Sequence, residues 1–377
     1  MSRYLLITDV QYRKAFDIIS MIKKTFPKEH LLLASIKWVS FNILCYGACA
    51  TEWLRTEEGE EAFDEDFSLL LKKYAQDELI YIPVEEQTTD YVINYVEKHG
   101  KKNLKYLLPS AMLYKTFRNK KKLSDYCQCH GFPAPREFDV RDLPDVEYPV
   151  LLKPEIGSGS HGIYRLYGKE DYNEEVRTAV VRKNYLIQEL LPNGKEVRGA
   201  FFLCHEGKVV GAYTHKRIRT SPEEGGVTVL SSIDDNQELI KQGKELLEHV
   251  GWEGLVMLEY IYDDKSSQYK VIEANPRLWG SVMLSEYSGA NLLSNYVRIC
   301  LGQQILQQKL RRKAYVRWFF PMDIVAWLKK KGRIKSFWNF KDTCFINWTY
   351  ARKDRAVFFL LFSIFNNQSI KKLLHRV

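Results

Sequence analysis

The stretch YKVIEANPRLWGSV, residues 269–282, is the feature that most restricts what this chain can fold into. It begins as a strand pattern and carries Glu273, Asn275 and Arg277 on alternate positions, with Pro276 ending the strand because it has no backbone N–H. Alternate positions of a strand share one face, so a carboxylate, an amide and a guanidinium lie side by side. This set suits a hard metal ion with phosphate oxygens, and a salt bridge at a strand end is the alternative.

A second acidic strand precedes this one. The run GLVMLEYIYDD carries Glu259 and is joined to the first strand by a short polar loop, which predicts an antiparallel hairpin with Glu259 beside Glu273. Two buried carboxylates repel each other unless a cation neutralises them, and Mg²⁺ takes one or two carboxylates together with substrate phosphates. The sequence therefore predicts a metal site at Glu259, Glu273 and Asn275. A separate structural ion pair for each residue is the alternative.

A glycine-rich loop lies upstream, in YPVLLKPEIGSGSHGI at residues 148–163. Here Lys153 stands at the end of a strand and is followed by three glycines and two serines. Glycines allow backbone N–H groups to approach an anion closely, and the lysine adds positive charge. The pattern predicts a loop over phosphates, with a flexible hairpin as the alternative. It differs from a P-loop because the lysine precedes the glycines.

The front of the chain alternates short strands and helices over residues 1–110, which predicts a parallel sheet with helices on both faces. No G-x-G-x-x-G motif follows the first strand, so dinucleotide binding is disfavoured. Residues 111–135 have a helical pattern that ends at Gly131, residues 236–250 have another, and Glu206-Gly207 predicts a hairpin turn. The predicted class is α/β combined with α+β.

Taken in order, the lysine and glycine loop, the strand-end acid Glu189 and the E…ExN-P-R set resemble the ATP-grasp superfamily. The branch is the one with biotin carboxylase and the carbamoyl-phosphate synthetase large subunit. The resemblance covers roughly residues 1–300 and reaches back to NKKKLSDYCQCHGFPAP, where Lys120 matches the first nucleotide lysine. It implies an ATP-grasp fold with an N-terminal Rossmann-like pre-ATP-grasp domain over 1–110. The ATP-grasp domain would cover 111–308, with a small lid subdomain at about 135–195 and a large subdomain at about 196–308. A basic, aromatic-rich C-terminal extension would follow at 309–377.

The resemblance also implies a ligand set, with ATP and Mg²⁺ as cofactors and Mn²⁺ as an alternative metal. The residues it assigns to the nucleotide are Lys120, Lys153, Ser158, Gly159, Ser160, Glu189, Leu191 and Glu196. It assigns the metal to Glu259, Glu273 and Asn275. Arg277 and Lys153 become the catalytic residues, because Arg277 would face the γ-phosphate and the substrate carboxylate.

Several features separate this chain from the better-known members. LWGSV replaces the bicarbonate-binding pattern after NPR, and there is no Met-Lys-Met segment for biotin. The expected activity is therefore a stand-alone carboxylate–amine ligase. It would activate a carboxylate as an acylphosphate and join it to an amine, with a cell-envelope or polysaccharide precursor as the favoured substrate. The candidate substrate residues are His215, Arg217 and Arg219 in THKRIRTSPEEGGVTV, residues 214–229.

Charge suggests further partners. Residues 309–377 contain 17 Lys and Arg against three Asp, a net charge of +14. This favours an anionic membrane surface or polyanion in addition to the small-molecule substrates. Nucleic acid is not favoured, because no RNA-binding signature is present, and a homodimer is one option for assembly. Scattered cysteines and the absence of a secretory signal predict the cytoplasm, with a peripheral site at the inner membrane face as an alternative. A non-catalytic ATP-binding regulator, or a basic nucleic-acid- or membrane-binding protein, is the alternative function.

Overall fold

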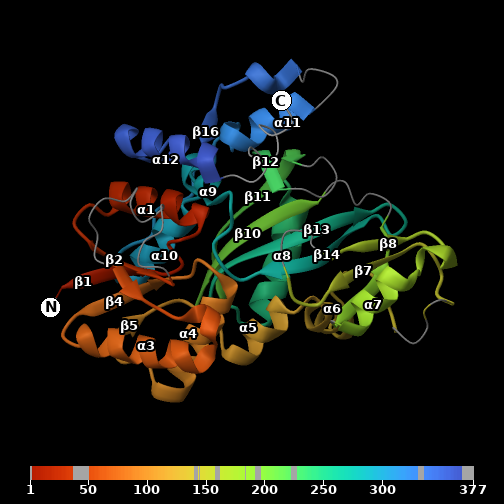
Figure 1. Cartoon of the computed structure of the whole chain (residues 1–377), viewed down its shortest axis with the longest axis horizontal. Coiled ribbons are helices and arrows are strands. Elements are labelled where there is room, and N and C mark those ends of the chain that lie inside the picture. Colours follow the sequence, from red (N-terminus) through yellow and green to blue (C-terminus); the bar gives the residue numbers. More distant parts are fainter. Residues whose placement is uncertain are drawn as a thin grey trace.

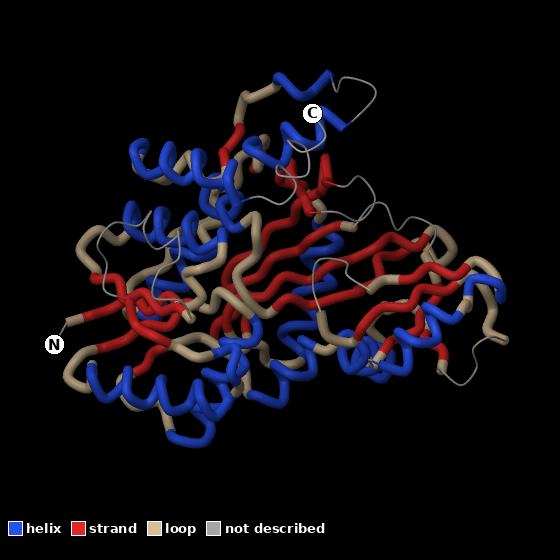
Figure 2. The backbone as a smooth tube through the Cα atoms, in the orientation of Figure 1, coloured by secondary structure: helices blue, strands red, loops and turns tan. Residues whose placement is uncertain are grey.

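The computed structural model describes residues 2–36, 51–139, 143, 145–157, 162–182, 184–191, 197–221, 227–329 and 335–366. These residues form three sheets with helices packed between and around them, as Figure 1 and Figure 2 show. One sheet is parallel and two are mainly antiparallel. The predicted combination of α/β and α+β structure is confirmed.

The N-terminal sheet is parallel, with strand order β3-β2-β1-β4-β5. Its strands are β1 (Arg3–Ile7), β2 (His30–Ser35), β3 (Thr51–Trp53), β4 (Glu78–Ile82) and β5 (Leu104–Lys105). Its helices are α1 (Arg13–Thr25), α3 (Glu60–Lys73) and α4 (Glu86–His99), with a short 3₁₀ turn η1 (Thr56–Glu58). Helices cover both faces because the strands are apolar on both sides. On β1, Leu5 and Ile7 join the core that contains α1, whereas Leu6 joins the core under α3 and α4.

The small sheet has strand order β6-β9-β7-β8. It consists of β6 (Glu137–Phe138), β7 (Val150–Pro154), β8 (Tyr164–Leu166) and β9 (Tyr185–Glu189), accompanied by η3 (Lys169–Asp171) and α7 (Glu174–Arg182). Val176 on α7 packs with Val150 and Ile187 in a separate core. In Figure 1 this sheet lies beside the outer strand of the large sheet.

The large sheet has strand order β14-β13-β10-β11-β12-β15-β16. Its strands are β10 (Arg198–His205), β11 (Lys208–Ser221), β12 (Val227–Asp234), β13 (Gly254–Asp263), β14 (Gln268–Asn275), β15 (Tyr315–Arg317) and β16 (Thr343–Phe345). The hairpin predicted at Glu206-Gly207 joins β10 to β11, and both residues have positive φ, 52° and 70°. Helices α5 (Ala111–Arg118), α6 (Lys120–Cys129) and α8 (Gln237–His249) pack on one face, and α9 (Val282–Ser288) and α10 (Leu292–Cys300) pack on the other.

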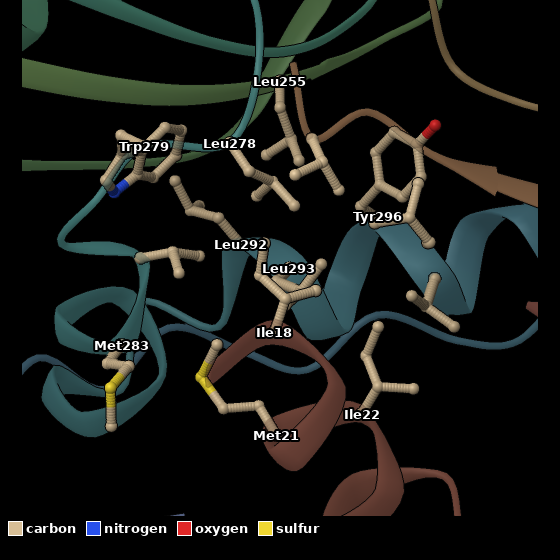
Figure 3. Packing of buried hydrophobic residues seen from close by; sticks show 14 of the residues in the cluster. Ile18, Met21, Ile22, Leu255, Leu278, Trp279, Met283, Leu292, Leu293 and Tyr296 are labelled. Carbon is tan, nitrogen blue, oxygen red and sulfur yellow. The ribbon is translucent and has the colours of Figure 1, made fainter. Parts of the chain in front are cut away.

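The largest core joins the N-terminal sheet to the large sheet. Ile18 and Ile22 of α1 pack with Leu293 and Tyr296 of α10 and with Leu255 of β13, as Figure 3 shows. This shared core holds the N-terminal sheet against the large sheet, whose strands β13 and β14 carry Glu259 and Glu273.

The C-terminal region is built into the large sheet. Strands β15 and β16 extend that sheet. Between them in the sequence lie η4 (Phe319–Asp323), α11 (Ile324–Lys329) and η5 (Lys335–Trp338), and α12 (Lys353–Asn366) follows β16. Arg317 is fully buried, pairs with Asp323 and lies about 4.8–4.9 Å from the ring centres of three phenylalanines. Within the described residues, no helix is both long and apolar enough to cross a bilayer.

The single helix predicted over residues 111–135 is wrong in one respect, because the chain breaks at Asn119. This residue is extended (φ −90°, ψ 118°), and its side chain accepts the Lys122 N–H at 3.0 Å to begin α6. Asparagine favours such a position because it can satisfy a free N–H at a helix start. The break places Lys120 at the first position of α6, where its backbone N–H donates to Glu155.

Asp17 links α1 to the C-terminal region and should make stability pH-dependent. It is 2% exposed, accepts the Asn347 N–H at 2.7 Å and pairs with Arg13 at 3.4 Å. Burial raises the pKa of Asp17 to about 7, although both partners oppose the rise. The folded state therefore holds a proton that the unfolded chain has lost, and stability falls as pH rises from about 4 to about 7. In Asp17→Asn this fall should be absent, so the Tm of the variant should gain on the wild-type Tm over that range. Parallel Tm curves from pH 5 to 7.5 would contradict it.

Candidate functional site: a carboxylate pair between two sheets

The hairpin predicted from the two acidic strands is confirmed. Glu259 on β13 stands directly opposite Glu273 on β14, and Asn275 follows on the same strand. The register shifts next to this pair, since Tyr260 pairs with Val271 and leaves Ile272 as an extra residue. Such bulges occur beside active sites because they free backbone groups from the ladder. Here the Ile272 carbonyl oxygen accepts a hydrogen bond from Lys153 Nζ at 2.9 Å.

Each carboxylate of the pair is held by a cation from another element. Arg217 Nη2 on β11 lies 2.7 Å from Glu259, and Lys120 Nζ lies 3.5 Å from Glu273. Burial raises the pKa of Glu273, and the neighbouring Glu259 adds to the rise, while Lys120 opposes it. Two facing carboxylates with a buried amide form an oxygen donor set that fits Mg²⁺ when phosphate oxygens complete it. Among the described residues there is no cluster of three or more His, Cys, Asp or Glu side chains that could hold a metal by itself.

Two buried lysines lie between the small sheet and the large sheet. Lys120 Nζ donates to the Gly157 carbonyl at 2.7 Å, at the point where the glycine-rich loop begins. Lys153 projects from β7 and is 5% exposed, so burial lowers its pKa to about 8, against the attraction of Glu273. Both ammonium groups therefore lie beside the carboxylate pair, where an anion with a bound metal would be neutralised.

Arg277 lies just beyond β14 and is fixed by three acceptors. Its Nε donates to Glu86 at 3.0 Å, its Nη2 donates to Asn275 Oδ1 at 3.1 Å, and its Nη1 donates to the carbonyl of Leu278 at 3.1 Å. Glu86 begins α4, so this bond ties the N-terminal domain to the end of β14, where Asn275 lies. Arg118 also approaches Glu86, at 3.6 Å.

The structure describes only some of the other residues that are predicted to bind the nucleotide. The Glu189 carboxylate at the end of β9 accepts from Lys270 at 2.7 Å and from the Arg136 N–H at 2.8 Å. Leu191 follows and is buried. Ser158, Gly159, Ser160 and Glu196 lie outside the described residues. The nucleotide roles of all these residues remain predictions.

The three candidate substrate residues lie on β11 but face different surroundings. Arg217 pairs with Glu259, so it lies beside the carboxylate pair. Arg219 forms two 2.8 Å bonds with the buried Asp323 in the C-terminal region. His215 is 5% exposed, and burial with Arg217 and Arg198 nearby lowers its pKa to about 3, which makes it a weak base.

A cavity of about 220 Å³ opens beside Arg277, and its polar groups include several that sequence reasoning missed. Asp9 follows β1, whereas Glu85 and Glu86 follow β4. Polar residues directly after the carboxyl ends of parallel strands were the available signal, because ligands bind at that edge of such sheets.

The chain is similar to ATP-binding enzymes across this region. Residues 136–308 match the family described as the carbamoyl-phosphate synthase L chain, ATP-binding domain. The C-terminal section of the carbamoyl phosphate synthase large chain from Methanopyrus kandleri is 26% identical over 202 residues, which cover 46% of this chain and 35% of that protein. This chain spans well under half the length of the first curated relatives that it matches.

Solved structures show the same fold at low identity. The biotin carboxylase domain of Hydrogenobacter thermophilus 2-oxoglutarate carboxylase gives a TM-score of 0.64 at 14% identity, covering 83% of this chain and 73% of that one. The L-amino acid ligase from Bacillus licheniformis gives 0.61 at 17% identity, covering 84% and 79%. The match over residues 136–308 and the shared fold identify an ATP-binding domain of the ATP-grasp type, similar to those of carbamoyl-phosphate synthase and biotin carboxylase.

Proposed function

We propose that this chain is an ATP-dependent carboxylate–amine ligase that works through an acylphosphate. The observation that carries the proposal is the facing pair of Glu259 and Glu273. Lys120 and Lys153 lie beside this pair, and Arg277 lines the cavity. ATP-grasp chemistry of the acylphosphate type is the common activity of the superfamily. The specific proposal for this chain is that an amine then reacts with the acylphosphate to form an amide.

The chemistry follows from charge. A carboxylate oxygen of the acid attacks the γ-phosphorus, the bond from that phosphorus to the bridging oxygen breaks, and ADP leaves with the bridging oxygen. The amine nitrogen then attacks the acyl carbon, the bond from that carbon to the oxygen carrying the phosphoryl group breaks, and the phosphate leaves with that oxygen and takes the amine proton. Lys120, Lys153 and Arg277 would neutralise the anions and orient the reacting oxygens. Mg²⁺ at Glu259, Glu273 and Asn275 would withdraw negative charge from the phosphates when bound.

The proposal also covers the class of substrate and the role of the basic C-terminal region. A cell-envelope or polysaccharide precursor is the substrate class that the sequence favours. The basic residues after 308 are proposed to contact an anionic surface, although β15 and β16 also extend the large sheet. Liposome flotation with and without anionic lipid tests that contact.

An ADP-release screen tests the function. The full chain is supplied with ATP and MgCl₂ and with pairs of acids and amines, including amino acids, sugar acids, dicarboxylates and bicarbonate. We expect one acid to raise ADP release, and mass spectrometry to find a product that equals acid plus amine minus water. A carboxylated product formed from bicarbonate would favour a carboxylase instead. No ADP release with any acid or with bicarbonate would contradict the proposal.

A further inference from the structure

The cavity beside Arg277 has a cationic side. Arg277 donates three of its five N–H groups to protein acceptors, which leaves one on each terminal nitrogen. The Nε of Arg118 is buried and has no hydrogen-bond partner among the described residues. Both guanidinium groups line the cavity next to Gly157, where the glycine-rich loop begins. Two adjacent guanidinium groups with spare donors suit a carboxylate.

The cavity is also lined by a buried carboxylate, Asp9, that forms no ion pair within the described part of the chain. Asp9 is 5% exposed and accepts one hydroxyl bond on each oxygen, from Thr8 at 2.7 Å and from Thr88 at 2.8 Å. Its other lone pairs remain available. Burial raises the pKa of Asp9 to about 6 and Glu85 adds to the rise, whereas the bonds from Thr8 and Thr88 and the charge of Lys14 oppose it.

Glu85 and Glu86 differ from Asp9 in this respect, and Glu57, the fourth acid of the lining, is exposed to solvent. Glu85 pairs with Lys14 at 3.0 Å, and Glu86 pairs with Arg277 and Arg118. Asp9 has no ion pair within the described part of the chain. The ionised form of a buried carboxylate that lacks an ion pair is costly, and a cationic group of a ligand would reduce that cost.

We infer that the cavity binds a small zwitterionic amino acid, with its carboxylate at Arg277 and its ammonium group at Asp9. This inference rests on the proposed function, and it names an amino acid, in place of the cell-envelope or polysaccharide precursor, as the acid that is activated. The volume of about 220 Å³ is small for a ligand pocket and admits a ligand of amino-acid size. Arg277 also contacts Asn275, one of the proposed metal ligands. An amino-acid carboxylate bound to Arg277 would therefore lie close to the proposed position of the γ-phosphate. The carboxylate oxygen attacks the γ-phosphorus and ADP leaves, while the ammonium group keeps its protons and serves as an anchor.

Matched ligands test the inference on the wild-type chain. The twenty protein amino acids are compared with their N-acetyl forms, which lack the ammonium group, and with their methyl esters, which lack the carboxylate. Binding is measured by calorimetry in the presence of Mg²⁺ and ADP, and ADP release is measured with ATP. We expect at least one free amino acid to bind, and both modified forms to bind at least about tenfold more weakly. Equal binding of the N-acetyl form would overturn the inference.

The variant Asp9→Asn locates the ammonium site. It should raise the KM of the amino acid by about ten- to a hundredfold and leave the KM of ATP unchanged. Glu60→Gln, at a surface pair with Lys98 outside the cavity, is the matched control and should change neither. An unchanged amino-acid KM in a folded Asp9→Asn variant would contradict the assignment. If only acids without an amino group support ADP release, the inference fails alone; if amino acids bind at Asp9 but no acid supports ADP release, the proposed function fails alone.

Discussion

Replacing Glu273 by glutamine should reduce ADP formation by about 10³-fold while the protein stays folded. Glutamine keeps the volume of the side chain but removes the negative charge that faces Glu259. Lys120 loses an ion pair of 3.5 Å and keeps its bond to the Gly157 carbonyl, so little stability is lost. Because burial already raises the pKa of Glu273, a neutral side chain is well tolerated there.

The measurements separate a lost metal ligand from a damaged fold. ADP release is followed over a Mg²⁺ titration, and we expect the variant to need more Mg²⁺ as well as to turn over more slowly. Glu253→Gln is the matched control, because Glu253 pairs with His205 at 2.9 Å beside the start of β13 and lies outside the site. Its rate should equal the wild-type rate. A Glu273→Gln variant with normal turnover and normal Mg²⁺ dependence would contradict the proposed metal site.

Local patterns predicted the parts of the site that lie on adjacent strands. Glu259 and Glu273 could be paired from sequence because a short loop between two strands permits only an antiparallel neighbour. The alternation of Glu273, Asn275 and Arg277 then placed them at one edge. These inferences needed only the two-residue period of a strand and the length of one loop.

Other parts could not be predicted because they depend on distant contacts. Glu86 lies 191 residues before Arg277, and the two meet through long-range contacts such as the bond from the Leu278 N–H to the Pro83 carbonyl and the core shared by α1 and α10. The bulge at Ile272, which frees a carbonyl for Lys153, has no local sequence signal. Likewise, the charge of the C-terminal region suggested an anionic partner, yet one of its basic residues, Arg317, is buried among aromatic rings and pairs with Asp323.

Replacing Arg277 by lysine should lower kcat by about 10²–10³-fold with little change in the KM of ATP. The guanidinium bonds Glu86, Asn275 and the carbonyl of Leu278 in one plane and keeps an N–H free on each terminal nitrogen. An ammonium group has no such planar fork, so it cannot keep the three bonds and still present two donors to a reacting carboxylate.

The Arg277→Lys comparison needs a control that loses a similar fork elsewhere. Arg55→Lys serves, because Arg55 makes a two-oxygen contact with Asp66 on the surface of the N-terminal sheet. Its kcat should not change. Glu86→Gln should lower kcat by less than Arg277→Lys, because Arg277 would keep Asn275 and the Leu278 carbonyl as acceptors while losing a charged partner. If Arg277→Lys keeps the wild-type kcat, or loses only ATP affinity, then Arg277 does not contact the transferring phosphate or the acid.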